Sequence, residues 1–317
     1  MIYIHKDEVI KSSEYIWFEH FCKLLKVDYK IINAQDRDFI TSLDTKDDDI
    51  LIARFGHDKE DKINTVRVLP ILNKKFKRMY PSTESYHYYD DKLKQYEFML
   101  ENNIPCLDTY YVSSKEEIEK LNIDFPIVAK KTWGAGAEQI NYFKTLDSVV
   151  DDETTRGWTE KSIYPCLVQE YSDCEYDLRL NIVNSKVFME RRLHLWKTEN
   201  KDNFPYGMPE TPREKVLKYR YPPYEPLKTK ECTTRDFSDN YELIKQLYSM
   251  QKKLNTNYMS WDIVNGKVLE FSVQATRDAR NTYLDMNDNQ HKKYDYLSNR
   301  FISKKLLYEI LYGLINV

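Results

Sequence analysis

Residues 1–53 alternate between short β-rich runs and an amphipathic segment. Ile2 to Ile4, Tyr29 to Ile32 and Ile50 to Ala53 are apolar runs of strand length, and residues 16–25 place large apolar side chains at helical spacing. The order strand, helix, strand, strand predicts a small parallel α/β domain. Arg54 to His57 follow the third run, at the carboxyl end of an expected strand, where a plain turn through Gly56 and a substrate-binding loop are both possible.

Composition excludes several classes of protein. The 317 residues are 41% hydrophobic and include 26 tyrosines, which is ample for packed cores and argues against disorder. A net charge of −3, with the two signs interleaved, argues against a dedicated nucleic-acid binder. No apolar run has the length of a signal peptide or a membrane span, so we expect a cytoplasmic protein without membrane insertion.

The metal-binding and cross-linking residue types are sparse. Five cysteines, an odd number, contain no C-x-x-C pair, and six histidines contain no H-x-x-x-H pair. This argues against a disulfide framework or a structural zinc site. We expect each cysteine to be a small buried apolar side chain.

Glycine is unusually rare. The chain has 7 glycines, where average usage would give about 22. Gly134 and Gly136 are the only two that lie close together. The scarcity argues against a Rossmann fingerprint or a P-loop, and neither motif occurs.

The remaining chain is expected to continue as an α/β mixture. Pro81-Ser82-Thr83 opens a polar helix that ends before Pro105, and the residues after Asn265-Gly266 form a hairpin with those before it. A long irregular segment covers about 196–238, and an apolar-striped helix covers about 294–315. Further strands are expected near 108–112, 125–130, 166–170, 177–183, 186–192, 258–264 and 267–271.

Four segments occur in an informative order. They are DDKLKQYEFMLENNIP (90–105), FPIVAKKTWGAGAEQI (125–140), LVQEYSDCEYDLRLNIVNSKVFMERR (167–192) and MSWDIVNGKVLEFS (259–272). Together they resemble the ATP-grasp superfamily, and most closely the ATP-grasp proteins of bacterial surface-polysaccharide gene clusters. The resemblance implies an α/β (α+β) fold with an N-terminal parallel α/β domain (1–90), a central lid subdomain (91–170) and a C-terminal subdomain with a metal site (171–317).

The resemblance assigns the phosphates of ATP to two lysines and a small-residue loop. Lys92 and Lys130 match the two ATP-binding lysines of the family. Lys131 stands where the family usually has proline, which leaves open which of the adjacent lysines points inward. Gly134 and Gly136 lie in the loop whose backbone would approach the phosphates, and the family loop is usually richer in glycine.

The base and ribose of ATP would be read by a hinge segment. Gln169, Glu170 and Tyr171 match the family hinge that reads the adenine edge. An acidic residue a few positions on holds the ribose in the family, and Asp173 and Glu175 are both available.

Arg179 and Arg192 fit the family pattern D-x-R … R on paired strands, beginning at Asp177. A guanidinium can bind a carboxylate or a γ-phosphate at two points, which makes these two arginines the candidate catalytic groups. The alternative for Arg179 is a structural ion pair with Asp177 or Glu190. Strand alternation also allows Arg191, rather than Arg192, to face the site.

Asp262 and Glu270 are the metal-ligand candidates. They lie on two strands joined by the Asn265-Gly266 turn, and we expect both to project from one face toward Mg²⁺. Ser272 occupies the position of a usual asparagine ligand and would bind more weakly. Arg277 and Arg280 either bind an acidic substrate or are solvated in a loop.

The resemblance implies an ATP- and Mg²⁺-dependent ligase. A small carboxylate would take the γ-phosphate as an acyl phosphate, and an amine would then displace phosphate; a carboxylated sugar for a surface glycan is one such substrate. Two alternatives are a kinase that stops at phosphoryl transfer and a nucleotide-binding module without catalysis. The habit of the family also allows a homodimer.

Overall fold

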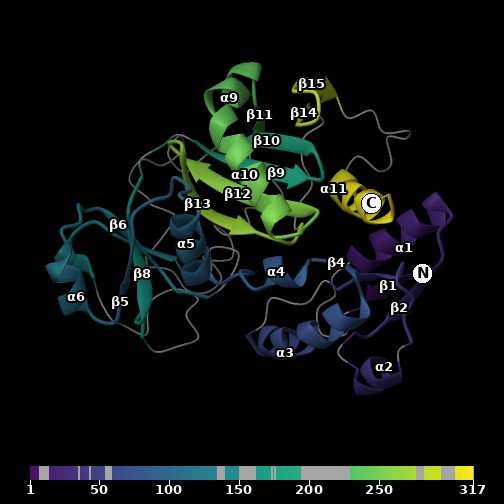
Figure 1. Cartoon of the computed structure of the whole chain (residues 1–317). Coiled ribbons are helices and arrows are strands. Elements are labelled where there is room, and N and C mark those ends of the chain that lie inside the picture. The colour runs from purple at the N-terminus through teal and green to yellow at the C-terminus, as the bar shows by residue number, and fades with distance from the viewer. Residues whose placement is uncertain are drawn as a thin grey trace, which may run out of the picture.

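The structure is a computed structural model. It describes residues 1–6, 14–34, 36–42, 44–53, 59–133, 140–149, 162–172, 174, 176–193, 229–275, 282–293 and 304–316. Within these ranges the strands form three sheets, which lie one after another across the molecule (Figure 1). Arg54 to His57 and most of the segment 196–238 lie outside the described residues.

The first sheet is parallel, as the alternation of strands and a helix predicts. Its order is β2 (Tyr29–Ile32), β1 (Ile2–His5), β3 (Ile50–Ile52) and β4 (Arg78–Tyr80). The connecting helices are α1 (Glu14–Leu25), α2 (Arg37–Ser42) and α3 (Lys59–Lys75). Phe18, Phe21 and Cys22 of α1 are buried against the apolar side chains of β1 and β3, which anchors this helix on the sheet.

The polar segment after β4 forms two helices, so the prediction of one continuous helix is wrong. The helices are α4 (Thr83–Tyr86) and α5 (Lys92–Glu101). The break lies at Asp90, whose φ is +54°, and at Asp91, whose side chain caps α5 by accepting a hydrogen bond from the Lys94 N–H. The Asp91 side chain satisfies a backbone N–H at the start of α5, which favours a new helix start at this position over a continuous helix.

The second sheet, called here the lid sheet, is antiparallel. Its order is β5 (Thr109–Val112), β8 (Cys166–Glu170), β6 (Ile127–Lys130) and β7 (Ile140–Phe143). One face packs Ile127, Ala129 and Val168 with Ile118 of α6 (Lys115–Lys120) into a small core, and η1 (Leu146–Ser148) lies next to it. The other face therefore carries the alternate residues, Lys130 and Gln169 among them.

The third sheet, called here the central sheet, has seven strands. Its order is β13 (Lys267–Ser272), β12 (Tyr258–Val264), β9 (Tyr176–Val183), β10 (Lys186–Leu193), β14 (Thr282–Asp285) and β15 (Gln290–Lys293), and β11 (Thr229–Glu231) also pairs with β10. Asn265 and Gly266, with φ of +48° and +75°, form the two-residue turn between β12 and β13 that the sequence predicts.

Helices cover one face of the central sheet. α5, α9 (Thr234–Asp239) and α10 (Tyr241–Lys253) lie on the face that presents Leu180, Met259 and Trp261. α5 is tied directly to β13, because the Phe271 N–H donates to Gln95 Oε1 at 3.1 Å. At one end of the opposite face, Val183, Phe188 and Tyr258 pack under α11 (Lys305–Ile315).

α11 joins the central sheet to the first sheet. It lies beside α1 in Figure 1, and its apolar stripe is buried in the core that it shares with Phe18 and Phe21 of α1. The Asn184 amide and the Arg78 guanidinium donate to its Glu309 and Leu314 carbonyls at 2.7 and 3.0 Å. The part of the stripe from Leu306 to Leu314 packs in the core as predicted, and residues 294–303 of the expected helix lie outside the described residues. No described helix has both the length and the apolar character needed to cross a bilayer.

The cysteines follow the prediction in part. Cys22, Cys166 and Cys232 are buried, and burial raises the pKa of the Cys22 and Cys232 thiols to about 12. Cys106 and Cys174 are half-buried, so the expectation of full burial is wrong for these two.

Candidate active site

Asp262 and Glu270 are directly opposite each other on β12 and β13. A regular hairpin closed by Asn265-Gly266 would instead pair Asp262 with Leu269, and Glu270 would then point to the other face of the sheet. The pairing shifts by one residue between Asp262 and Ile263, which leaves Leu269 as the extra residue of a β-bulge. The bulge, rather than the turn alone, brings the two carboxylates to one face.

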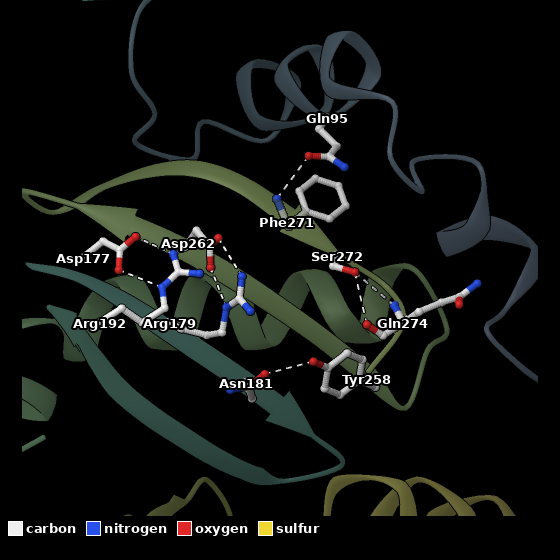
Figure 2. A network of polar contacts seen from close by, with 10 residues as sticks. All are labelled: Gln95, Asp177, Arg179, Asn181, Arg192, Tyr258, Asp262, Phe271, Ser272 and Gln274. Carbon is white, nitrogen blue, oxygen red and sulfur yellow. Dashed lines mark hydrogen bonds and ion pairs between the residues drawn. The ribbon is translucent and has the colours of Figure 1, made fainter. Parts of the chain in front are cut away.

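Two arginines surround Asp262 on this face (Figure 2). Arg179, its cross-strand neighbour on β9, donates from Nε and Nη2 to the two carboxylate oxygens, both at 2.9 Å. Arg192 on β10 reaches Asp262 Oδ2 with Nη2 at 2.9 Å. Arg192 also holds Asp177 with two hydrogen bonds of 2.7 and 2.5 Å. Arg179 thus pairs with a carboxylate on a third strand, and not with Asp177 or Glu190.

The two arginines keep Asp262 ionised in a buried place. Asp262 is 5% exposed, and burial alone would raise its pKa. The guanidinium groups of Arg192 and Arg179 outweigh burial and hold the pKa of Asp262 well below its usual range. In return, Asp262 raises the pKa of both arginines against the effect of their own burial. This face therefore carries fixed charges of both signs at any physiological pH.

In each of two pairs of adjacent basic residues, Arg191–Arg192 and Lys130–Lys131, the two side chains point to different sides of their strand. Arg191 lies on the helix-covered face, where it hydrogen-bonds Asp236 of α9 and lies 4.5 Å from the Tyr176 ring centroid. Lys131 donates to the Tyr164 carbonyl at 3.3 Å. Arg192 and Lys130 are consequently the members of each pair that face Asp262.

Lys130 ends β6 and is buried, with 5% exposure. Burial lowers its pKa to about 8; the Glu270 and Asp262 charges oppose this shift, and the Lys92 charge adds to it. Lys92 is the first residue of α5, and its N–H donates to the Thr132 carbonyl at 2.7 Å. This backbone bond ties the segment after β6 to the start of α5, and the charges of Lys92, Glu270 and Asp262 all act on Lys130.

Gln169 lies on the same face of the lid sheet as Lys130 and is 6% exposed. Its Nε2 donates to Thr109 Oγ1 at 2.6 Å, whereas its Oε1 is buried and accepts no hydrogen bond from any described residue. A buried acceptor without a donor is costly and points to a missing partner. Thr109, which fixes the amide, carries no signal in the sequence that would identify it.

The side chain of Glu170, the next residue, is oriented differently. Glu170 is exposed on the opposite face of the lid sheet, where its carboxylate accepts from the Asp124 N–H at 3.4 Å. The Tyr171 N–H donates to the Pro126 carbonyl at 2.9 Å and extends the pairing of β8 with β6. Gln169 and Glu170 therefore present their side chains to opposite faces of the lid sheet.

Several solved structures match the fold over nearly the whole chain. D-alanine–D-alanine ligase from Bacillus anthracis matches with a TM-score of 0.57 and 14% identity, over 99% of this chain and 95% of that chain. A RimK-domain ATP-grasp protein from Sphaerobacter thermophilus matches with a TM-score of 0.55 and 11% identity, over 99% and 98%. The chain has an ATP-grasp fold.

A third match is the ATP-grasp ligase PsnB in complex with a minimal precursor, Mg and ADP. Its TM-score is 0.56 at 11% identity, over 87% of this chain and 90% of that chain. No family model and no curated protein sequence matches the chain. The likeness therefore shows the ATP-grasp fold.

The carboxylate pair of Asp262 and Glu270 suits Mg²⁺. An ionised carboxylate offers about four acceptor positions, and the arginines fill three of those on Asp262. Glu270 is half-buried, and no described residue donates a hydrogen bond to its carboxylate. Mg²⁺ typically takes one or two carboxylates and completes its shell with phosphate and water. No group of three or more His, Cys, Asp or Glu side chains in the described chain forms a full protein cage, so such a site would need the phosphates.

Ser272 lies two residues beyond Glu270 and opposite Ser260. Its hydroxyl donates to the Gln274 carbonyl at 3.2 Å and accepts from the Gln274 N–H at 3.4 Å. The hydroxyl is thus engaged in its own turn, at the other end of the polar face in Figure 2. Gly134, Gly136, Asp173, Glu175, Arg277 and Arg280 lie outside the described residues.

Proposed function

We propose that the chain is an ATP- and Mg²⁺-dependent carboxylate–amine ligase. The observation that carries the proposal is that a cationic surface of the lid sheet faces a carboxylate pair of the central sheet. The lid sheet contributes the buried Lys130 and Gln169. The central sheet contributes Asp262 and Glu270, together with the arginines bound to Asp262. Cations on one side and metal-ligand oxygens on the other match what a magnesium triphosphate requires.

The nucleotide would be read at three places. Lys92 and Lys130 would bind the phosphates, supported by the backbone of the loop with Gly134 and Gly136. The buried Gln169 Oε1 would accept from the adenine amino group, which supplies the donor that it lacks. The Glu170 and Tyr171 backbone would line the base, and Asp173 or Glu175 would hold the ribose.

Glu270 and one remaining position on Asp262 would hold the metal, with Ser272 as a further candidate ligand. When bound, the metal neutralises phosphate charge and orients the triphosphate. Arg192 and Arg179 would stabilise the charge that develops on the transferred phosphoryl group and hold the substrate carboxylate. Catalysis then depends on position and charge, and no side-chain nucleophile is needed.

The proposed reaction has two steps. A carboxylate oxygen of the substrate attacks the γ-phosphorus, the bond to the β-phosphate oxygen breaks, and ADP and an acyl phosphate form. The amine nitrogen then attacks the acyl carbon, inorganic phosphate leaves with the bonding pair, and the nitrogen loses a proton. The solved structures of this fold named above include two ligases, which supports ligation over simple phosphorylation.

The finer proposal is that the carboxylate belongs to a small cytoplasmic metabolite or sugar used for a surface glycan. It is supported by the resemblance of the Tyr89-Asp90-Asp91-Lys92 helix start and of the Glu-x-Ser at 270–272 to proteins of such gene clusters.

The test is ADP release by the purified protein with a panel of carboxylates, each with and without amines, followed by mass analysis of the product. A ligase requires both substrates and yields an amide of matching mass. ADP formed with one substrate and no amine dependence would instead indicate a kinase. Glu270→Gln serves as the matched inactive control, because it keeps the size of the side chain and removes the charge.

A further inference from the structure

Asp262 is already occupied by internal cations. Arg179 holds both of its oxygens and Arg192 adds a third hydrogen bond, with all three distances at 2.9 Å. A divalent cation that approached Asp262 in this state would meet two guanidinium groups in hydrogen-bond contact with the same oxygens. Because the group is buried, water screens this repulsion only weakly.

The two arginines are held in different ways. Arg192 keeps two hydrogen bonds to Asp177 and would stay in place without Asp262. Arg179 forms an ion pair with Asp262 alone among the described residues. Arg179 is therefore the group that has to find a new anion when a metal takes its place.

A triphosphate supplies that anion. Its terminal oxygens would arrive beside Lys130, whose charge interacts with both Glu270 and Asp262. A guanidinium binds phosphate oxygens in the same two-point geometry as a carboxylate. Transfer of Arg179 from Asp262 to a phosphate would open the Asp262 oxygens to the metal without leaving any charge unpaired.

We propose that Arg179 is an internal counter-ion that keeps Asp262 closed to divalent metal until a nucleotide triphosphate draws the guanidinium away. The proposal rests on the proposed function, because it requires Asp262 and Glu270 to be metal ligands. It makes metal binding conditional on nucleotide: the free metal binds weakly, and the nucleotide has affinity of its own.

The direct test is a Mn²⁺ titration in the absence of nucleotide. Binding is measured as the loss of the electron paramagnetic resonance signal of free Mn²⁺. Arg179→Gln should bind Mn²⁺ about tenfold or more tightly than the unaltered protein, because one fixed positive charge beside the ligand is removed. Arg191→Gln is the matched control. It removes an equal charge from β10, the strand paired with that of Arg179, but from the helix-covered face of the sheet. This variant should bind Mn²⁺ like the unaltered protein. Adding Glu270→Gln to Arg179→Gln should abolish the gain.

Equal Mn²⁺ affinity in Arg179→Gln and the unaltered protein would overturn the proposal, and so would a gain that survives Glu270→Gln. A second measurement uses the unaltered protein alone, so it does not depend on the folding of a variant. A non-hydrolysable ATP analogue should bind in excess EDTA; strict dependence of its binding on metal would also overturn the proposal.

The same titrations separate this proposal from the proposed function. If the analogue binds with Mg²⁺ present but Mn²⁺ alone binds the unaltered protein as tightly as Arg179→Gln, only the counter-ion role of Arg179 fails. If the analogue binds neither with nor without metal, the proposed function itself fails.

Discussion

Lys130 of the lid sheet and Glu270 of the central sheet interact electrostatically, although they are 140 residues apart in the chain and belong to different sheets. The lysine is buried and the glutamate is half-buried, and each has the opposite charge. The pair marks the place where the two sheets approach with their charged faces, and a magnesium triphosphate would lie between the two charges.

Nucleotide affinity should fall as the pH rises through 8. The pKa of Lys130 is lowered to about 8, mainly by burial, so the free protein loses this positive charge above that pH. The dissociation constant of an ATP analogue, measured by calorimetry from pH 7 to pH 9.5, should rise by up to about tenfold per pH unit above the pKa. Lys130→Arg should remove the dependence, because arginine keeps its charge in this range. A flat profile in the unaltered protein would contradict the assignment.

Lys130→Met should stabilise the nucleotide-free protein. The folded state lowers the lysine pKa from 10.5 to about 8, so holding the proton there costs on the order of 3 kcal/mol below pH 8. The unfolded chain binds more protons between pH 8 and 10.5, so the cost shrinks as the pH rises and is gone above 10.5. We expect Lys130→Met to raise the free energy of unfolding by about 1–3 kcal/mol at pH 7, and by little at pH 10.5. Urea titrations at both pH values check this, and nucleotide binding should be lost.

The bulge at Leu269 gives a counter-intuitive prediction. Deleting Leu269 would leave Glu270 opposite Asp262 in a regular hairpin, so Mg²⁺-dependent nucleotide binding should be retained within about threefold. Exchanging the two residues (Leu269→Glu with Glu270→Leu) keeps composition and length but puts leucine opposite Asp262, and binding should be lost. The reverse order of the two affinities, with circular dichroism unchanged, would show that the bulge does not position Glu270.

Gly313→Ala should loosen α11. A Cβ atom at Gly313 would lie 2.1 Å from Asn184 Oδ1, and Asn184 is held by hydrogen bonds to the Glu309 carbonyl and the Asn257 amide. The clash forces Asn184 to give up these bonds, which should cost about 1–3 kcal/mol in the free energy of unfolding. Asn184→Gly in the same chain should recover part of the loss, because glycine accepts the φ of +51° and removes the obstructing side chain. A denaturation series with the two single variants and the double variant measures this coupling.

Local pattern is sufficient for much of the fold. The parallel order of the first sheet follows from apolar runs such as Ile50 to Ile52, and the β12–β13 hairpin follows from Asn265-Gly266, because both signals act over a few residues. The break between α4 and α5 was also present in the sequence as Asp90-Asp91, but apolar periodicity alone does not detect a cap inside a helical pattern.

The contacts that define the site are long-range. Arg179 selects Asp262, which is 83 residues away, because β12 pairs with β9, and the nearer Asp177 belongs to Arg192. The same-face placement of Glu270 depends on a bulge that has no glycine or proline to mark it. Residue type therefore indicates the chemistry of the site, whereas strand order and register decide which charges meet.

A crystal structure of the protein with Mg²⁺ and a non-hydrolysable ATP analogue tests the central claim most directly. We expect the triphosphate between Lys130 and Glu270, the metal on Glu270 and Asp262, and the adenine amino group on Gln169 Oε1. A nucleotide bound at another surface, or a metal that contacts neither Asp262 nor Glu270, would contradict it.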